Sequence, residues 1–114
     1  MSRINLHNKR FCSIFNTING QVNVETIFHY YQERNVVWAM YKGGQIRIGT
    51  LSGFIKDDSK LSFRYGHWDI DGVFRTGSCT SQISIQDDGR IRLQESWQWD
   101  DEKDSGESTL VEIV

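Results

Sequence analysis

The chain has 114 residues, a formal net charge of −2 and a sequence pI near 5.9. A chain of this length predicts one domain over residues 1–114, and a hydrophobic content of 38% is high enough to argue against disorder. The slight acidity makes a nucleic-acid partner unexpected, because nucleic-acid-binding domains usually carry a basic excess.

Alternating apolar and polar residues dominate the chain after a poorly patterned start, which we expect to be a loose N-terminal arm or short lid over residues 1–9. Alternation at period 2 predicts strands with one buried face and one solvent-exposed face. Turn dipeptides such as Asn19-Gly20 and Asp88-Gly89 separate them. The expected strands are residues 10–18, 22–33, 36–42, 45–55, 60–68, 73–86, 90–100 and 109–114.

The clearest pattern lies in residues 90–100, where only Glu95 interrupts an otherwise apolar face. That face holds Ile91, Leu93, Trp97 and Trp99, and the predicted faces of the other strands group Val24, Thr26, Phe28 and Tyr30, then Ile46, Ile48 and Phe54, then Leu61, Phe63, Tyr65 and His67. Strand 36–42 is apolar on both sides, with Trp38 and Met40 on one face. In strand 73–86 alternation does not show which side chains face inward, and we expect a bulge near Gly77.

Short turns between eight strands predict that sequential strands pair as antiparallel neighbours. The fold class is therefore all-β: an up-and-down antiparallel meander that closes into a roughly eight-stranded barrel, similar in architecture to lipocalin, fatty-acid-binding or avidin-like barrels. The complete absence of proline suits strands that are paired on both sides. An eight-stranded barrel is just wide enough to be filled by side chains or to hold one small ligand, and the sequence leaves both open.

Several stretches resemble a family of small bacterial β-barrel proteins whose members are often labelled N-acetylglutamate synthase. The resemblance is carried by Asn19-Gly20, Glu25-Thr26-Ile27-Phe28-His29-Tyr30, Val37-Trp38-Ala39, Tyr41, Gly43-Gly44, Phe63-Arg64-Tyr65, His67, Thr76-Gly77, Cys79, Asp88-Gly89-Arg90-Ile91-Arg92-Leu93, Glu95, Trp97-Gln98-Trp99 and Gly106-Glu107-Ser108. An acetyltransferase of the usual kind would need a Gly-rich loop that opens a helix. Hairpin chemistry accounts better for Gly43-Gly44, and no helical pattern follows. The resemblance therefore implies the barrel and supplies no catalytic residue.

Glu95 is the sharpest candidate for a functional residue, because a carboxylate on an apolar face is costly to bury without a partner. It either contacts a polar or cationic group of a ligand, or pairs internally with Arg75, Tyr65 or His67, or is exposed beyond a bulge. His67 is either a ligand contact or a structural histidine. The two side chains could also meet across a narrow barrel as an acid–base pair.

The aromatic residues of the predicted interior support two interpretations. They are Tyr30, Trp38, Tyr65, Trp97 and Trp99, and they either line an apolar pocket or fill the core. Our leading hypothesis is non-catalytic binding of a small, partly apolar ligand inside the barrel, with Tyr30, Tyr65, His67, Glu95 and Trp97 as contacts. One alternative is an interaction module with a filled barrel that works through its surface or as a homodimer. The other is a small enzyme that uses Glu95 and His67.

No metal site, cofactor or catalytic residue is assigned. Cys12 and Cys79 match no metal-ligand spacing and are interpreted as reduced thiols. The acidic stretch 100–104 lacks the spacing of a calcium loop, and the arginines at 47, 64, 90 and 92 are interpreted as a solvated exterior rather than a nucleic-acid platform. No apolar run reaches membrane-spanning length and no signal segment is seen, so we expect a cytoplasmic protein without membrane association.

Overall fold

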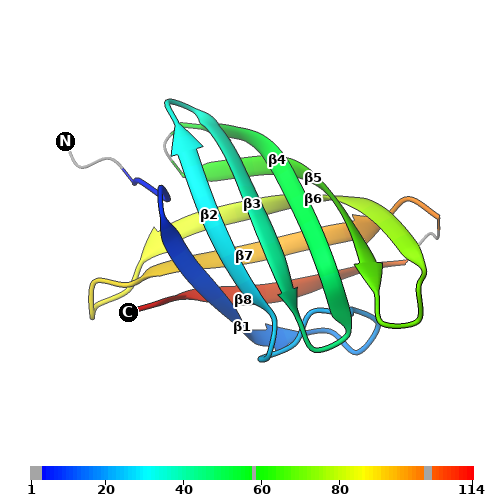
Figure 1. Cartoon of the computed structure of the whole chain (residues 1–114). Coiled ribbons are helices and arrows are strands. Elements are labelled where there is room, and N and C mark those ends of the chain that lie inside the picture. Colours follow the sequence, from blue (N-terminus) through cyan, green and yellow to red (C-terminus); the bar gives the residue numbers. More distant parts are fainter. Residues whose placement is uncertain (1–3, 58, 102–103) are drawn as a thin grey trace.

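The computed structural model describes residues 4–57, 59–101 and 104–114, and these form a closed barrel of eight strands (Figure 1). The strands are β1 Lys9–Asn16, β2 Ile27–Glu33, β3 Val36–Gly43, β4 Ile46–Lys56, β5 Lys60–Asp69, β6 Phe74–Ile85, β7 Ile91–Trp99 and β8 Ser105–Ile113. Each strand pairs antiparallel with the next, and β8 returns to pair with β1. The predicted all-β meander is confirmed, and closure leaves no unpaired sheet edge.

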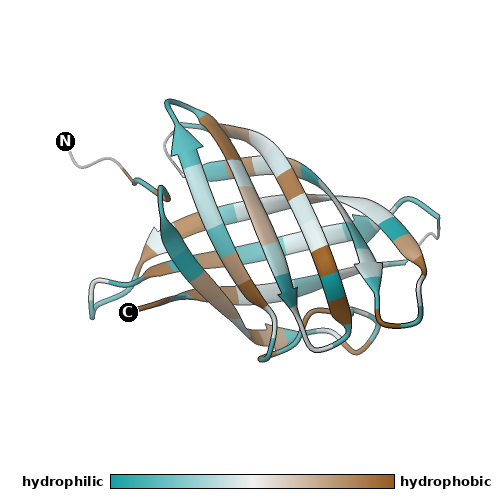
Figure 2. Ribbon diagram, in the orientation of Figure 1, coloured by the Kyte–Doolittle hydropathy of each residue, from teal (hydrophilic) through white to brown (hydrophobic). Residues whose placement is uncertain are grey.

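The inward faces of β5 and β7 are those predicted from alternation. Figure 2 shows apolar and polar residues alternating along the strands. In β7, all five alternate residues from Ile91 to Trp99 are buried, and Glu95 is one of them at 6% exposure. In β5, Leu61, Phe63 and His67 are buried and Tyr65 is half-buried. The alternate residues of β5 and β7 that were predicted to share one face therefore do point toward the barrel interior.

The predicted faces of β3 and β4 need correction. Trp38 lies on the outer face of β3, whereas Val37 and its alternate neighbours Ala39 and Tyr41 are buried. In β4 the pairing with β5 shifts register between Ile46 and Ile48, so Ile46 faces inward while Ile48 and Phe54 are exposed. A register shift adds one residue to one strand and thereby reverses the parity beyond it. Because it lies on the outer face of β3, Trp38 is excluded from the interior aromatic set.

Two predicted strand boundaries and one predicted bulge also differ from the structure. The second strand begins at Ile27 rather than at residue 22, so Val24 is exposed in a non-strand segment. The last strand begins at Ser105 rather than at residue 109. The pairings of β6 with both neighbours show no register shift, so the bulge expected near Gly77 is absent.

The two ends of the barrel are covered differently. Within the described part of the expected N-terminal arm, Leu6 is fully buried in the core and its backbone N–H donates to Gln32 Oε1 at 2.9 Å. Residues 4–8 therefore close one end, and residues 1–3 lie outside the described residues. Residues 17–26, which join β1 to β2 and are here named the covering segment, lie at the opposite end. No helix long and apolar enough to cross a membrane occurs in the described chain.

Candidate functional site

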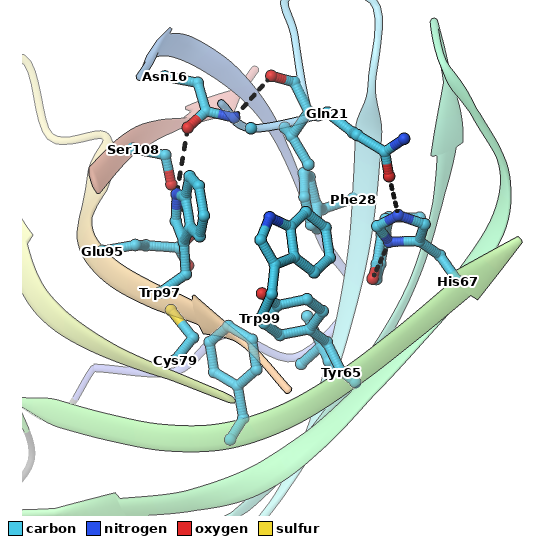
Figure 3. Close-up of a pocket in the computed structure, with 15 residues that line it drawn as sticks. Asn16, Gln21, Phe28, Tyr65, His67, Cys79, Glu95, Trp97, Trp99 and Ser108 are labelled. Carbon is cyan, nitrogen blue, oxygen red and sulfur yellow. Dashed lines mark hydrogen bonds between the residues drawn. The ribbon is translucent and has the colours of Figure 1, made fainter. Parts of the chain in front are cut away.

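A small, partly open cavity of about 50 Å³ lies between the barrel wall and the covering segment (Figure 3). All eight strands contribute to its lining, which comprises Asn16, Phe28, Tyr41, Leu51, Phe63, Tyr65, His67, Cys79, Glu95, Trp97, Trp99 and Ser108, together with Gly20, Gln21 and Val22 of the covering segment. Fully buried side chains such as Phe11, Tyr30 and Leu93 occupy the rest of the described core. The interior is therefore neither a hollow calyx nor completely filled.

Small residues on β6 make room for the aromatic wall of the cavity. Gly77 lies opposite Tyr65 of β5 and also opposite Trp99 of β7. Because Gly77 has no side chain, these two rings meet over it edge to face, with centroids 5.7 Å apart. Trp99 in turn packs against Trp97 at 5.7 Å, and the Arg75 guanidinium stacks 3.7 Å from the Trp99 ring centroid. The wall combines large apolar faces with a cation at its rim, a cation–π arrangement.

Glu95 is buried beside this wall with one carboxyl oxygen unpartnered. The Ser108 hydroxyl donates to Glu95 Oε1 at 3.1 Å, and Oε2 has no hydrogen-bond partner among the described residues. Of the alternatives left open for Glu95, pairing with Arg75, Tyr65 or His67 and exposure beyond a bulge are both wrong, because the carboxyl is buried and its partner is Ser108. Burial raises the pKa of Glu95 to about 8, although the Ser108 hydrogen bond acts in the opposite direction. At neutral pH the group is mostly an uncharged acid that can both donate and accept a hydrogen bond.

Two further buried polar atoms lack partners in the described chain. They are the Ser81 hydroxyl, directly opposite Glu95 in the register, and the Tyr30 hydroxyl. Tyr30 is not part of the cavity lining and packs on Phe11, with ring centroids 5.1 Å apart. Burial is the main cause that raises the pKa of the Tyr30 hydroxyl. Buried polar atoms without partners are uncommon, and they indicate places where water or a ligand group completes the hydrogen bonding.

His67 is held by a chain of polar contacts. Tyr41 Oη lies 3.0 Å from His67 Nδ1, and Gln21 Oε1 lies 2.7 Å from Nε2. The Gln21 side-chain amide also donates to Asp69 Oδ2 at 3.0 Å. Burial, followed by the nearby positive charge of Arg75, lowers the pKa of His67 to about 4. The imidazole is therefore neutral near pH 7.

The structure brings four of the five predicted contact residues to one cavity: Tyr65, His67, Glu95 and Trp97. Tyr30 lies outside it. His67 and Glu95 hydrogen-bond to different groups and not to each other, so the proposed acid–base pair lacks its direct contact.

The polar lining residues Asn16, Gln21 and Ser108 were not predicted as contacts from the sequence. Asn16 Oδ1 accepts a hydrogen bond from the Trp97 indole N–H at 3.1 Å, and its side-chain amide donates to the Val22 carbonyl at 2.8 Å. These residues lie at a strand end, in the covering segment and in a stretch interpreted as a loop. Local alternation carries no signal for such contacts, because they depend on how the barrel end is closed and most join residues far apart in the chain.

The acidic stretch 100–104 and the exterior arginines were the remaining candidates from the sequence. Among the described residues, no group of three or more His, Cys, Asp or Glu side chains is placed to hold a metal ion. Asp100 of the acidic stretch hydrogen-bonds to Arg64 and to Thr76, while residues 102–103 lie outside the described part. Arg90 pairs with Asp88 at 2.9 Å.

A sequence model of the avidin-like protein family matches residues 4–113 of the chain. The match therefore spans all eight strands, both barrel ends and the cavity. Comparison with curated proteins and with solved structures finds no match.

Proposed function

This chain belongs to the avidin-like protein family, and on that basis we propose that it binds a small, partly apolar molecule inside the barrel. The observation that carries the proposal is the cavity between the aromatic wall and Glu95, whose Oε2 is buried without a partner. Ligand sites typically combine mainly apolar linings with a few convergent polar groups, and this cavity has that composition.

The size of the cavity limits how the ligand enters. A volume of about 50 Å³ exceeds the space of a single water molecule but is far below the roughly 300–1,000 Å³ of pockets for drug-sized ligands. Because Gly20, Gln21 and Val22 form one wall, displacement of the covering segment enlarges the cavity without disturbing a strand. The apolar part of the ligand then lies against Trp97 and Trp99.

Glu95 is assigned the polar end of the ligand. As an uncharged acid it favours a neutral group, such as a carbonyl or hydroxyl, over a cation, because a cation would first require Glu95 to lose its proton in a buried environment. Ser108 holds the other carboxyl oxygen and so orients the free one.

Native mass spectrometry of the purified protein tests for a co-purified small molecule, and tryptophan fluorescence then measures its affinity because Trp97 and Trp99 line the cavity. Biotin, a ligand bound within this family, is the first external probe. We expect Glu95→Leu to weaken binding at least tenfold and Glu95→Gln, which keeps a donor and an acceptor, to retain most of it. Unchanged affinity in Glu95→Leu would remove Glu95 from the site.

A second candidate function uses the outer surface. Trp38, Met40 and Phe74 are exposed around Gly66 and line a surface hollow, and Phe74 packs on exposed Trp68 with ring centroids 5.0 Å apart. We propose that this face associates with a second copy of the chain, since large exposed apolar patches commonly mark protein interfaces. Light scattering should give the mass of a dimer that becomes a monomer in Trp38→Ser. A monomer at all concentrations rejects this candidate.

A further inference from the structure

The side chain of Gln21 fills a polar position that the barrel has built between two buried groups. We propose that His67 and Asp69 form a recognition pair for a carboxamide or lactam group of the ligand, and that Gln21 occupies this pair until the ligand replaces it. This inference rests on the proposed function and adds to it the chemical class of the ligand and the contact that keeps the site closed.

Hydrogen-bonding rules determine the direction of every contact in this chain of residues. The Asp69 carboxylate only accepts, so the amide nitrogen of Gln21 faces Asp69 Oδ2, at 3.0 Å, and its carbonyl oxygen faces His67 Nε2, at 2.7 Å. His67 Nε2 must therefore carry the proton, and Nδ1 accepts from the Tyr41 hydroxyl at 3.0 Å. The pair presents one donor and one acceptor, which is the complement of a carboxamide.

The barrel fixes both members independently of Gln21. Asp69 Oδ1 accepts hydrogen bonds from the backbone N–H groups of Asp71, at 3.0 Å, and Val73, at 2.9 Å, which leaves Oδ2 directed at the amide. Val73 N–H is the main cause that holds the pKa of Asp69 below its usual value, so the acceptor stays ionised. Tyr41 of β3 orients the imidazole of His67. The recognition pair is therefore preorganised.

Leaving His67 Nε2 and Asp69 Oδ2 without a hydrogen-bond partner lowers the stability of the folded protein. His67 is 2% exposed and Asp69 5% exposed, so both are largely shielded from bulk water. Removing Gln21 leaves His67 Nε2 and Asp69 Oδ2 without the hydrogen bonds that satisfy them, and an unsatisfied buried group retains its desolvation cost. A ligand that offers the same order of acceptor and donor restores both bonds.

The covering segment is attached in a way that permits exchange. Ile18 is fully exposed and Val24 is 68% exposed, so Val22 is the one aliphatic side chain of the segment that packs against the core. Its other attachments include hydrogen bonds from Thr17 N–H to the Glu107 carbonyl at 3.0 Å and from Asn19 Nδ2 to the Ser105 carbonyl at 3.1 Å. Turning the Gln21 side chain away breaks its contacts with His67 and Asp69 and leaves the packing of Val22 in place.

The recognition pair is also continuous with the cavity. His67 meets Trp99 edge to face with ring centroids 5.6 Å apart, and both line the cavity with Gln21 (Figure 3). A ligand whose amide replaced that of Gln21 would extend over the Trp99 ring toward Glu95. One molecule would thereby contact both polar ends of the site.

Chemical rescue of Gln21→Ala tests the inference without knowledge of the natural ligand. The probe is propionamide, which reproduces the Gln21 side chain. We expect Gln21→Ala to lower the melting temperature by about 4 °C or more, and propionamide to restore part of this loss in a dose-dependent way. Sodium propionate, which offers only acceptors, should not, because it faces the Asp69 carboxylate. NMR of the His67 ring nitrogens should show propionamide perturbing Nε2.

Asn19→Ala is the matched control, since it removes a hydrogen bond of the same segment outside the recognition pair. Its melting temperature should not respond to propionamide. Equal responses of both variants, or equal effects of propionamide and propionate on Gln21→Ala, would overturn the inference and indicate that water completes the pair. If Gln21→Ala fails to fold, Gln21→Ser, whose hydroxyl is too short to reach His67, is used instead. Absent rescue with intact ligand binding refutes this inference alone, whereas rescue without any ligand binding refutes only the proposed function.

Discussion

Replacing Glu95 with glutamine removes one ionisable group from the interior while keeping the shape of the side chain. Glu95 is 6% exposed and its main perturbation is burial, which raises its pKa from 4.5 to about 8. The Ser108 hydrogen bond to Oε1 can be retained by the glutamine carbonyl. The substitution therefore isolates the cost of ionising a carboxyl inside the barrel.

The sign of the effect follows from proton binding. Between pH 4.5 and about 8 the folded protein keeps the Glu95 proton while the unfolded chain has lost it. Unfolding then releases a proton, so stability falls as pH rises through this window. Because each pKa unit is worth about 1.4 kcal/mol, the loss reaches up to ~5 kcal/mol, which is a large share of the ~5–15 kcal/mol that stabilises a typical domain.

Urea unfolding followed by tryptophan fluorescence, at intervals from pH 5 to 9, measures the free energy of unfolding of both proteins. The difference between Glu95→Gln and wild type at each pH cancels the contributions of other groups such as His67. We expect this difference to grow in favour of the variant by several kcal/mol up to about pH 8 and then level off. A difference that stays constant within about 0.5 kcal/mol would show that Glu95 does not hold a proton in the folded barrel.

Three more predictions concern the wall and the site. Trp97→Ala should lower the free energy of unfolding by roughly 3–5 kcal/mol. Trp68→Ala, at a residue 48% exposed, should lower it by less than about 1 kcal/mol. Equal losses in urea unfolding would contradict the inward orientation of Trp97. Gly53→Ala should lower the melting temperature more than Gly89→Ala does. A Cβ at Gly53 would lie 1.9 Å from a β5 carbonyl oxygen, whereas Gly89 has open space around it and only backbone strain at φ 88°. The reverse order of melting temperatures would refute close contact between β4 and β5. His67 should remain neutral down to about pH 5, and an NMR titration midpoint near 6.5 would contradict its burial.

The cavity depends on a run of small residues in β6. Gly77, Cys79 and Ser81 face inward from β6, each opposite a larger residue of β7. Trp97, opposite Cys79, can therefore lean over β6 without meeting a bulky side chain. Burial, followed by the charge of Glu95, raises the pKa of the Cys79 thiol, which keeps it protonated and unreactive in the cavity wall. These residues give the site its space rather than its polar contacts.

Alternation along single strands was sufficient to predict the closed barrel and the inward faces of β5 and β7. Side-chain direction along a strand is a local property with a period of two, so it can be read without knowing the neighbouring strands. Turn dipeptides added the antiparallel order of the strands. The same reasoning placed Glu95 and Trp97 in the interior, because both share parity with Leu93.

Alternation failed where parity was ambiguous or interrupted. Trp38 was placed in the interior set although β3 is apolar on both faces, and nothing local distinguishes the two. Ile48 was placed with Ile46 because the register shift that separates them exists only in the pairing with β5. Residues 22–26 have strand-like composition, yet they turn back at the barrel end instead of extending β2.

The sequence by itself determined the barrel, its strand order and the position of Glu95 on the same face as Leu93 and Trp97, since these depend on patterns within single strands and turns. Only the tertiary structure decided how much of the interior remains open and what surrounds it. The partners Ser108 and Gln21 come from distant parts of the chain, and the cavity is what remains after side chains of eight strands and one segment have packed. The size and shape of the cavity depend on all the contributing side chains at once, so no single stretch of sequence predicts them.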